Sequence, residues 1–330
     1  MKNIAVFVPH RDQFGNITTQ LPMLCALREE YPSAEITLYS KTDNSSLLAS
    51  CGVADHVVNY SSWSTRALLS HVNSKKFEQV YNVYSGSERI HCVVMLSNAK
   101  KKYGFSNSKW VHRFGNYDHH IFTQKGKQYI ALNNLELVNQ VSQKQYDTTI
   151  IEKYGSLTEM KPNNVVVLPG GGAGAFKVWD IENYCEVVSE LDKQFNGQGQ
   201  YAFTFVLGPD EAEKQQVIEK QLAGYDNVYI AQSPNITDLI ALASKASLVL
   251  SNDCGPCHIF QMLKAPMIMV WGWQEIKNGW RSPYHVLTEW YLAHDASWCV
   301  FPAEDKKNIN AIVPEQVTDI ATTYLAKQSL

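Results

Sequence analysis

The chain has 330 residues, of which 45% are hydrophobic and 18% charged, and its formal net charge is −3. This composition is typical of a globular protein with about two domains, and the slight negative charge argues against a general nucleic-acid binder. The first apolar run, residues 4–8, ends at Pro9 and is too short for a signal peptide or a membrane span. We therefore expect a cytoplasmic protein. Five of the seven cysteines are scattered singly without zinc spacing, and an odd number with no disulfide framework indicates reduced thiols.

Strand and helix patterns alternate through the first half of the chain. Short apolar or β-branched runs predict strands at residues 4–8, 35–39, 56–59 and 79–84. Helical periodicity predicts helices at about residues 17–31, 65–73 and 88–97. The predicted helices 17–31 and 65–73 each lie between two predicted strands, which is the order that a parallel sheet requires.

The second half of the chain repeats this alternation. Strands are predicted at residues 165–168, 203–207, 228–230, 248–250 and 267–270, and helices at about residues 181–195, 211–222, 236–243 and 256–264. Apolar runs without alternation are typical of parallel strands covered on both faces. We therefore predict an α/β protein with two doubly wound Rossmann-like domains, residues 1–153 and 154–330, separated within the polar stretch 143–162.

A polar turn, residues 251–258, follows the predicted strand 248–250 and begins a predicted helix. The N–H groups and dipole of such a helix favour an anion, so this turn is a candidate phosphate site. An ordinary βα turn in which Asp253 caps the helix is the alternative. Cys254-Gly255-Pro256-Cys257 also resembles the redox dithiol of thioredoxins, but it lies late in a long chain, whereas a thioredoxin domain of about 100 residues carries it near its start.

A glycine-rich turn follows the predicted strand 165–168. Gly170, Gly172 and Ala175 satisfy the dinucleotide fingerprint, which leaves a nicotinamide-dependent oxidoreductase as one alternative, but no acidic residue ends the next strand at the usual distance. A turn that lets the backbone approach a diphosphate, with Lys177 adding a positive charge, suits the sequence better. A surface loop with a solvated lysine is the remaining interpretation.

Several short motifs occur together in one known family. They are Gly15-Asn16 followed by QLPML at 20–24 and YPSAEI at 31–36, NLEL at 134–137, KVW at 177–179, D-x-G-P-x-H at 253–258, AP at 265–266, WG at 271–272, and VPEQV at 313–317. Over nearly the whole chain these motifs resemble glycosyltransferase family 9, the heptosyltransferases of lipopolysaccharide core assembly. The opening segment and the D-x-G-P-x-H block are the specific ones.

The resemblance implies a GT-B fold, with two Rossmann-like domains facing a cleft and the final helix packing back on the N-terminal domain. It implies inverting, metal-independent transfer of heptose from ADP-heptose in the C-terminal domain to an anionic glycolipid or oligosaccharide in the N-terminal domain, with no cofactor. Lys177 would stabilise the leaving diphosphate, and Glu211 would accept hydrogen bonds from the ribose hydroxyls. The implied donor-binding set is Gly170, Gly171, Gly172, Lys177, Glu211, Asp253, Cys254, Gly255, Pro256 and His258.

The sequence departs from the family at the catalytic position. The family's catalytic aspartate follows the glycine that is Gly15 here, and this chain has Asn16, whose amide cannot act as a base. Asp12 and His10 in the same turn are the alternative bases, and we favour Asp12. A catalytically impaired sugar-nucleotide-binding homologue is the other interpretation of Asn16.

Basic residues are concentrated between residues 100 and 127. This segment has seven Lys or Arg and one acidic residue, a net +6 with histidines neutral, which suits an anionic glycolipid and peripheral contact with the inner membrane. A solvated basic face is the alternative. From this segment, and from Arg89 near a basic acceptor-binding position of the family, the candidate acceptor residues are Arg89, Lys102, Lys109 and Arg113.

Overall fold

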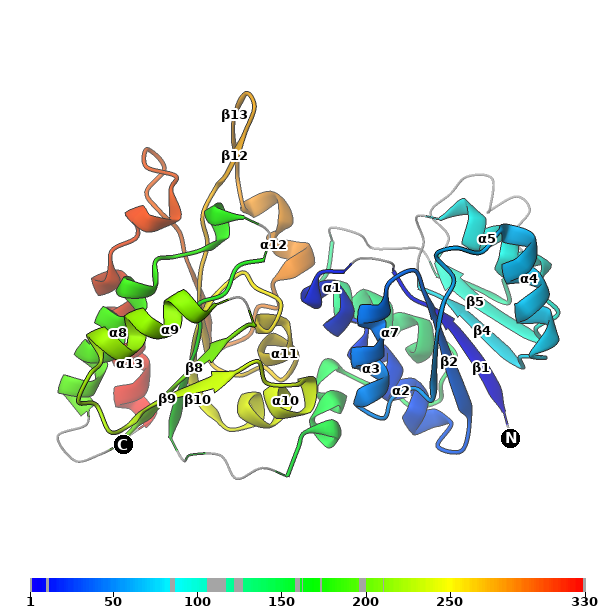
Figure 1. Cartoon of the computed structure of the whole chain (residues 1–330), viewed down its shortest axis with the longest axis horizontal. Helices are drawn as coiled ribbons and strands as arrows, with labels where there is room; N and C mark the ends of the chain where they lie inside the picture. Colours follow the sequence, from blue (N-terminus) through cyan, green and yellow to red (C-terminus); the bar gives the residue numbers. More distant parts are fainter. Residues whose placement is uncertain are drawn as a thin grey trace. The chain divides into compact units, whose positions relative to one another are not determined.

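The computed structural model describes residues 2–9, 12–83, 87–105, 117–121, 127–157, 161, 163–172, 174–195, 200–209 and 211–328, with backbone only at 119–121. The chain divides into two compact units, Met1–Tyr154 and Gly155–Leu330, and each contains a six-stranded sheet (Figure 1). Among the described residues, no helix combines the length and apolar character needed to cross a membrane.

The first unit alternates strands and helices. Its elements are β1 (Asn3–Phe7), α1 (Phe14–Thr18), α2 (Leu21–Glu30), β2 (Glu35–Ser40), α3 (Ser46–Ser50), β3 (His56–Asn59), α4 (Thr65–Ser74), β4 (Gln79–Asn82), α5 (Glu88–Leu96), β5 (Lys101–Phe105), β6 (His119–Ile121) and α7 (Ile130–Asn139), with 3-10 helices at Asp43–Ser45 and Thr148–Tyr154. The strands are parallel in the order β3-β2-β1-β4-β5-β6.

Helices cover both faces of the first sheet. On one face, α4 and α5 bury Leu68 and Val93 against Phe7, Tyr39 and other residues of the sheet (Figure 1). On the other face, α2 packs against α7. Every residue of β1 after the first is buried, as expected for a central strand covered on both sides.

The second unit has the same alternation. Its elements are β7 (Asn164–Leu168), the 3-10 helix η3 (Ala175–Lys177), α8 (Ile181–Phe195), β8 (Ala202–Leu207), α9 (Ala212–Gln221), β9 (Val228–Gln232), α10 (Ile236–Ser244), β10 (Ala246–Asn252), α11 (Cys257–Met262), β11 (Met267–Val270), β12 (Gln274–Ile276), β13 (Gly279–Arg281), α12 (Tyr284–Trp290), β14 (Ser297–Val300), the 3-10 helix Ile309–Ala311, and α13 (Pro314–Gln328). The large sheet is parallel in the order β14-β11-β10-β7-β8-β9, and β12 and β13 form a separate antiparallel hairpin.

The core of the second unit follows the two-residue period of its strands. Val165 and Val167 of β7 and Leu248 and Leu250 of β10 face α8 and the final helix α13, whereas the residues between them face the opposite side. Figure 1 shows α8, α9 and α13 on one side of this sheet and α10 and α11 on the other. The final helix buries its apolar residues in the core of the second unit through Val317 and its neighbours.

The two sheets confirm the predicted doubly wound architecture, and several boundaries are corrected. The predicted helix 17–31 is two helices, because the chain turns at Thr19 and Gln20 before Pro22, which is tolerated only in a first helical turn. The strand predicted at 79–84 ends at Asn82. The elements that the sequence did not predict include α3, β5, β6, α7, β12, β13, α12 and β14.

Both sheets have the Rossmann order, in which the first and fourth strands of each unit lie side by side. These are β1 and β4 in the first unit and β7 and β10 in the second. The connections leave this pair in opposite directions, so the loops that follow the two strands separate and leave a crevice at the carboxyl edge. Open α/β sheets bind ligands at this topological switch point.

Candidate functional site

The switch point of the second unit brings together the two turns that the sequence singles out. The glycine-rich turn 169–174 follows β7, and the turn that begins with Asp253 follows β10. The two strands are hydrogen-bonded neighbours, with Leu168 opposite Ser251. The predicted donor residues of these two turns therefore lie at one edge of one sheet.

A buried asparagine ties the two turns to each other. Asn252 is the last residue of β10, and its Nδ2 donates to Pro169 O at 2.9 Å. Its Oδ1 accepts from Trp179 N at 3.2 Å and from Tyr184 Oη at 2.8 Å. Because all these groups are buried, the hydrogen bonds hold the loop after β7 against the end of β10. Asn252 has no role in the sequence-based prediction, although an amide side chain at the end of an apolar strand is a signal that could indicate one.

An ion pair lies at the same place. The Lys177 ammonium, at the end of η3, pairs with the carboxylate of Asp253. The Asp253 side chain is 8% exposed, whereas Lys177 is 25% exposed. An ammonium has three N–H donors, so Lys177 can hold Asp253 and still donate to a second anion. The pairing gives the turn a positively charged group that a ligand can reach.

The glycines of the turn after β7 differ in whether a side chain would fit at their positions. A Cβ at Gly171 would lie 2.6 Å from Val178 Cγ2 and 2.9 Å from Lys177 O, so only glycine fits beside η3. At Gly172 a Cβ would meet nothing within 4 Å. Gly171 is therefore required by the packing that positions Lys177, whereas Gly172 leaves backbone open to an approaching group.

Glu211 lies on the neighbouring side of the same edge. Its Oε2 accepts from Gly208 N at 2.7 Å, and its Oε1 pairs with the Lys214 ammonium. Lys214 also donates to Pro169 O at 2.7 Å. A Cβ at Gly170 would lie 3.5 Å from Glu211 Oε1, which places this carboxylate against the glycine-rich turn. The structure thus brings Glu211 to the turn where the sequence analysis expects it.

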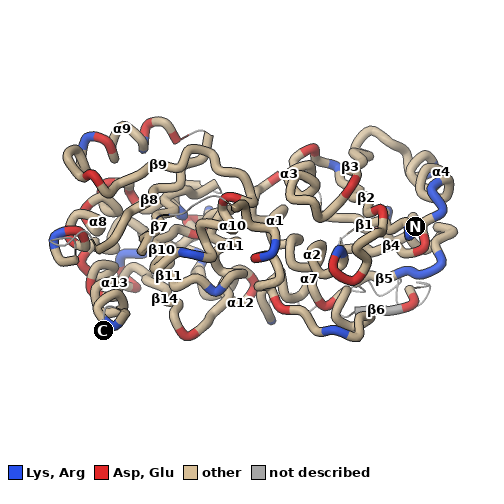
Figure 2. The backbone as a smooth tube through the Cα atoms, turned by 90° about the horizontal axis from the view of Figure 1, so that it is seen from below, with Lys and Arg blue, Asp and Glu red and all other residues tan. Residues whose placement is uncertain are grey.

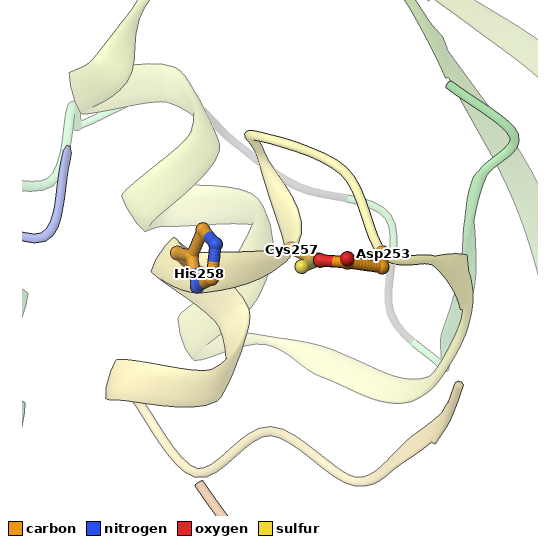
Figure 3. Close-up of side chains that lie close together, drawn as sticks. All are labelled: Asp253, Cys257 and His258. Carbon is orange, nitrogen blue, oxygen red and sulfur yellow. The ribbon is translucent and has the colours of Figure 1, made fainter. Parts of the chain in front are cut away.

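A thiol, a carboxylate and an imidazole lie close together in the turn after β10 and the start of α11. Cys257 Sγ, a carboxylate oxygen of Asp253 and a ring nitrogen of His258 lie within 4.8 Å of one another, and Figure 3 shows the Cys257 sulfur directed toward the Asp253 carboxylate. Burial lowers the pKa of His258 to about 4, against the opposing effect of Asp253. His258 is therefore neutral at pH 7. The ammonium of Lys177 on Asp253 opposes a cation in this cluster.

The helix after this turn is shorter than predicted, which corrects the expected source of positive potential. The predicted helix 256–264 is α11, Cys257–Met262, whose N-cap is Pro256 in a helical conformation. Six residues sum few peptide dipoles, so α11 contributes little to an anion site. The charge of Lys177 and the backbone N–H groups of the turn remain as the groups that can bind an anion.

In the first unit, the structure places Asn16 and Asp12 but not His10, which lies outside the described residues. Asn16 is in α1, and its Nδ2 donates to Gln13 Oε1 at 3.3 Å. Asp12 is exposed, and its backbone carbonyl accepts from Asn44 Nδ2 at 3.3 Å. The Asp12 carboxylate is therefore open to solvent four residues before the asparagine, in the turn that follows β1.

A hydrogen-bonded cluster lies at the end of β4, the strand beside β1 at the switch point of the first unit. Asn82, the last residue of β4, donates through Nδ2 to Tyr117 Oη at 2.9 Å. Tyr117 Oη is hydrogen-bonded to His91 Nδ1 of α5 at 2.6 Å, and all three side chains are buried. A Cβ at Gly104 would lie 2.7 Å from the Tyr117 ring, so glycine is required in β5. The sequence analysis missed this cluster because its members are far apart in the chain.

Two of the four candidate acceptor residues are described, and both are tied to the protein. Arg89 Nη2 donates to Trp63 O at 2.5 Å, and Lys102 Nζ donates to Met95 O at 2.7 Å, where burial lowers the pKa of Lys102. Lys109 and Arg113 lie outside the described residues. Figure 2 shows the basic run at the start of β5, whose first two lysines pair with Glu78 and Asp118.

Comparison with known proteins agrees with this architecture. The chain matches the solved Escherichia coli heptosyltransferase WaaC with ADP, with a TM-score of 0.69 and 14% identity over 98% of this chain and 99% of that one. It matches Escherichia coli ADP-heptose lps heptosyltransferase II with a TM-score of 0.65 and 15% identity over the full length of both chains. These matches establish the fold, which is GT-B with two Rossmann-like domains.

The sequence comparisons then give the family. The profile of glycosyltransferase family 9 (heptosyltransferase) matches residues 65–286. The chain is also 24% identical over 273 residues to lipopolysaccharide core heptosyltransferase OpsX of Haemophilus influenzae, covering 77% of this chain and 75% of that protein. The chain belongs to glycosyltransferase family 9 and is a glycosyltransferase. The profile match begins after the turn that contains Asp12 and Asn16.

Proposed function

We propose that this protein transfers a heptose from ADP-heptose to the lipopolysaccharide core, with inversion at the anomeric carbon and without a metal ion. The observation that carries the proposal is the Lys177–Asp253 ion pair at the switch point of a family 9 fold. WaaC has been solved with ADP and with ADP-2-deoxy-2-fluoro heptose, and the Haemophilus relative is a lipopolysaccharide core heptosyltransferase. These relatives support the donor and acceptor classes.

In the proposed reaction, an acceptor hydroxyl attacks the anomeric carbon of the donor sugar. The bond from that carbon to the diphosphate oxygen breaks, a base takes the hydroxyl proton, and the diphosphate leaves with an additional negative charge. Lys177 stabilises this charge from a position that Asp253 and Asn252 fix in advance, so little reorganisation is needed during the reaction. A lysine in this role replaces the positive charge that a divalent cation would supply.

The remaining donor contacts are assigned from position. The open backbone at Gly172 and the turn from Cys254 to His258 face the diphosphate, and Glu211 accepts from the ribose hydroxyls. Asp12 is the proposed base, because it is the described titratable side chain nearest in sequence to the family's catalytic position. Arg89, Lys102, Lys109 and Arg113 are proposed to bind the anionic acceptor in the first unit.

We also propose that the protein is cytoplasmic and contacts the inner membrane peripherally. An acceptor glycolipid is held in a membrane, and the lysines at the start of β5 suit an anionic membrane surface (Figure 2).

A transfer assay tests the proposed function. The purified protein is incubated with ADP-heptose and a heptose-deficient core acceptor, and the product is detected as an acceptor heavier by one heptose. Product that forms in the presence of a chelator supports the proposal. Transfer from UDP-, GDP- or CMP-linked sugars but not from ADP-heptose would contradict the donor assignment. Before the assay, the nucleotides can be ranked by how much each raises the melting temperature of the protein.

A further inference from the structure

The turn at the proposed diphosphate site contains two cysteines whose thiol groups have no role in the proposed transfer reaction. Cys254 and Cys257 are the first and fourth residues of the turn through Gly255 and Pro256, and both are free thiols. A four-residue turn brings its end Cα atoms within about 7 Å, and disulfides span Cα separations of about 4.4 to 6.8 Å. The Cα separation of this turn is therefore within the range that a disulfide spans.

The environments of the two sulfurs differ. The Cys254 sulfur lies 3.8 Å from Ser251 Oγ. The hydrogen bond from the Cys257 thiol lowers the pKa of Cys254. Complete burial raises the pKa of Cys257, whose sulfur accepts from Gln261 Nε2 at 3.3 Å. Of the two thiols, Cys254 is therefore the one that loses its proton more readily.

We propose that Cys254 and Cys257 form a redox-active pair that a hydroperoxide oxidises reversibly to a disulfide, and that this disulfide weakens binding of the donor diphosphate. The second half of the proposal rests on the proposed function. The oxidant is a small hydroperoxide because Cys254 is only 6% exposed, which excludes a protein disulfide.

The chemistry proceeds in two balanced steps. The Cys254 sulfur attacks the peroxide oxygen, the O–O bond breaks, and a sulfenic acid forms with release of water when the oxidant is hydrogen peroxide. The Cys257 sulfur then attacks the sulfenic sulfur, the S–O bond breaks, and a second water leaves. Overall, two thiols lose two hydrogens to one hydrogen peroxide, which becomes two waters. A dithiol reductant reverses the change by thiol–disulfide exchange.

The disulfide acts on the donor site through the turn itself. The two sulfurs must move from hydrogen-bonding distance to a bond of about 2.05 Å, which displaces the backbone between them. Asp253 precedes this turn and holds Lys177, so a displacement of the turn moves the ion pair that is proposed to bind the diphosphate. Misplacement of binding groups by about 1 Å is costly, and we expect ADP affinity to fall about tenfold or more.

The test compares the reduced protein with the peroxide-treated protein. Peptide mapping by mass spectrometry should find the 254–257 peptide lighter by two hydrogens, and calorimetry should find ADP binding weakened and then restored by dithiothreitol. Cys257→Ala should bind ADP with an affinity that peroxide no longer lowers. Cys185→Ala, which removes a buried thiol elsewhere in the same unit, should behave as wild type.

Two results would overturn the proposal. One is peroxide consumption at other cysteines while Cys254 and Cys257 stay reduced, and the other is formation of the disulfide with ADP affinity unchanged. If the reduced wild type binds no ADP at all, the proposed function fails, and the mass measurement still decides whether the pair is redox-active. The wild-type comparison needs no variant, so it holds if Cys257→Ala fails to fold.

Discussion

The two units have the same strand order, and each ends its fourth strand on a buried asparagine, but the two asparagines bind different neighbours. The side chain of Asn252, at the end of β10, is hydrogen-bonded to the loop after β7, which contains Lys177. Asn82 bonds to Tyr117 and His91, which lie beyond β4. In the second unit the two turns are therefore tied into one charged site.

The difference shows how one topology can serve two tasks. Stabilising a leaving diphosphate requires a charge fixed in position, which the Asn252 hydrogen bonds and the Lys177–Asp253 pair provide. Receiving an acceptor hydroxyl requires a base that the hydroxyl can reach, and the Asp12 carboxylate is exposed.

The largest effect is expected from the base in the first unit. Asp12→Asn should lower kcat by about a hundredfold or more, because a proton acceptor is lost, while ADP binding to the second unit persists. Steady-state kinetics and calorimetry measure the two quantities. If Asn16→Asp raises kcat sharply and Asp12→Asn has no effect, the family position is the catalytic one. Loss of wild-type activity as pH falls near about 6.5 would indicate a histidine base.

The next effect concerns the fixed charge of the second unit. Lys177→Ala should lower kcat by about a hundredfold, and it should raise the ADP dissociation constant by about tenfold or less, because charge on the diphosphate grows in the transition state. Lys177→Arg keeps the charge, and Lys193→Ala removes an exposed ion pair of the same unit as a control. A raised KM with unchanged kcat would contradict this role, because it would mean that Lys177 binds the ground state and the transition state equally.

The two asparagines offer a matched pair of variants. Asn252→Ala leaves the Trp179 N–H and the Tyr184 hydroxyl without this partner, and it should lower the free energy of unfolding by about 2 to 4 kcal/mol and ADP affinity by about tenfold. Asn82→Ala should also destabilise the protein but leave ADP affinity unchanged. Urea unfolding and calorimetry measure both. Equal losses of ADP affinity would remove the distinction between the two switch points.

A further effect is a pH dependence of stability. Burial lowers the pKa of His258 to about 4, below its unfolded value of about 6.5, so the unfolded chain binds this proton first. The stabilisation is present above pH 6.5 and is lost as pH falls toward 4, by about 3 kcal/mol in total. His258→Gln should flatten unfolding curves measured between these pH values. An unchanged slope would show that His258 does not titrate as assigned.

The sequence predicted the parts that depend on local pattern. The run Val165–Leu168 is apolar throughout because β7 is buried on both faces, and this signal was sufficient for most strands. By contrast, β5 begins with two lysines and contains Gly104, so its pattern does not resemble a buried strand. The split of the helix at Thr19 and Gln20 depends on Pro22, which the helical period alone does not reveal.

The sequence indicates several residues of the candidate site but not the contacts between them. Lys177 and Asp253 were both singled out, but they are far apart in the chain, and their pairing depends on the buried hydrogen bonds of Asn252. The shortness of α11 was not predicted either, because Leu263 and Lys264 continue a helical pattern that the structure ends at Met262.

The central claim is that the second unit binds the donor diphosphate through Lys177, and calorimetric titration of ADP and AMP tests it most directly. Wild type should bind ADP about tenfold or more tightly than AMP, because the second phosphate adds a charge-assisted hydrogen bond. In folded Lys177→Ala this preference should fall to about threefold or less, whereas Lys193→Ala should keep it. An undiminished preference for ADP in Lys177→Ala would contradict the claim.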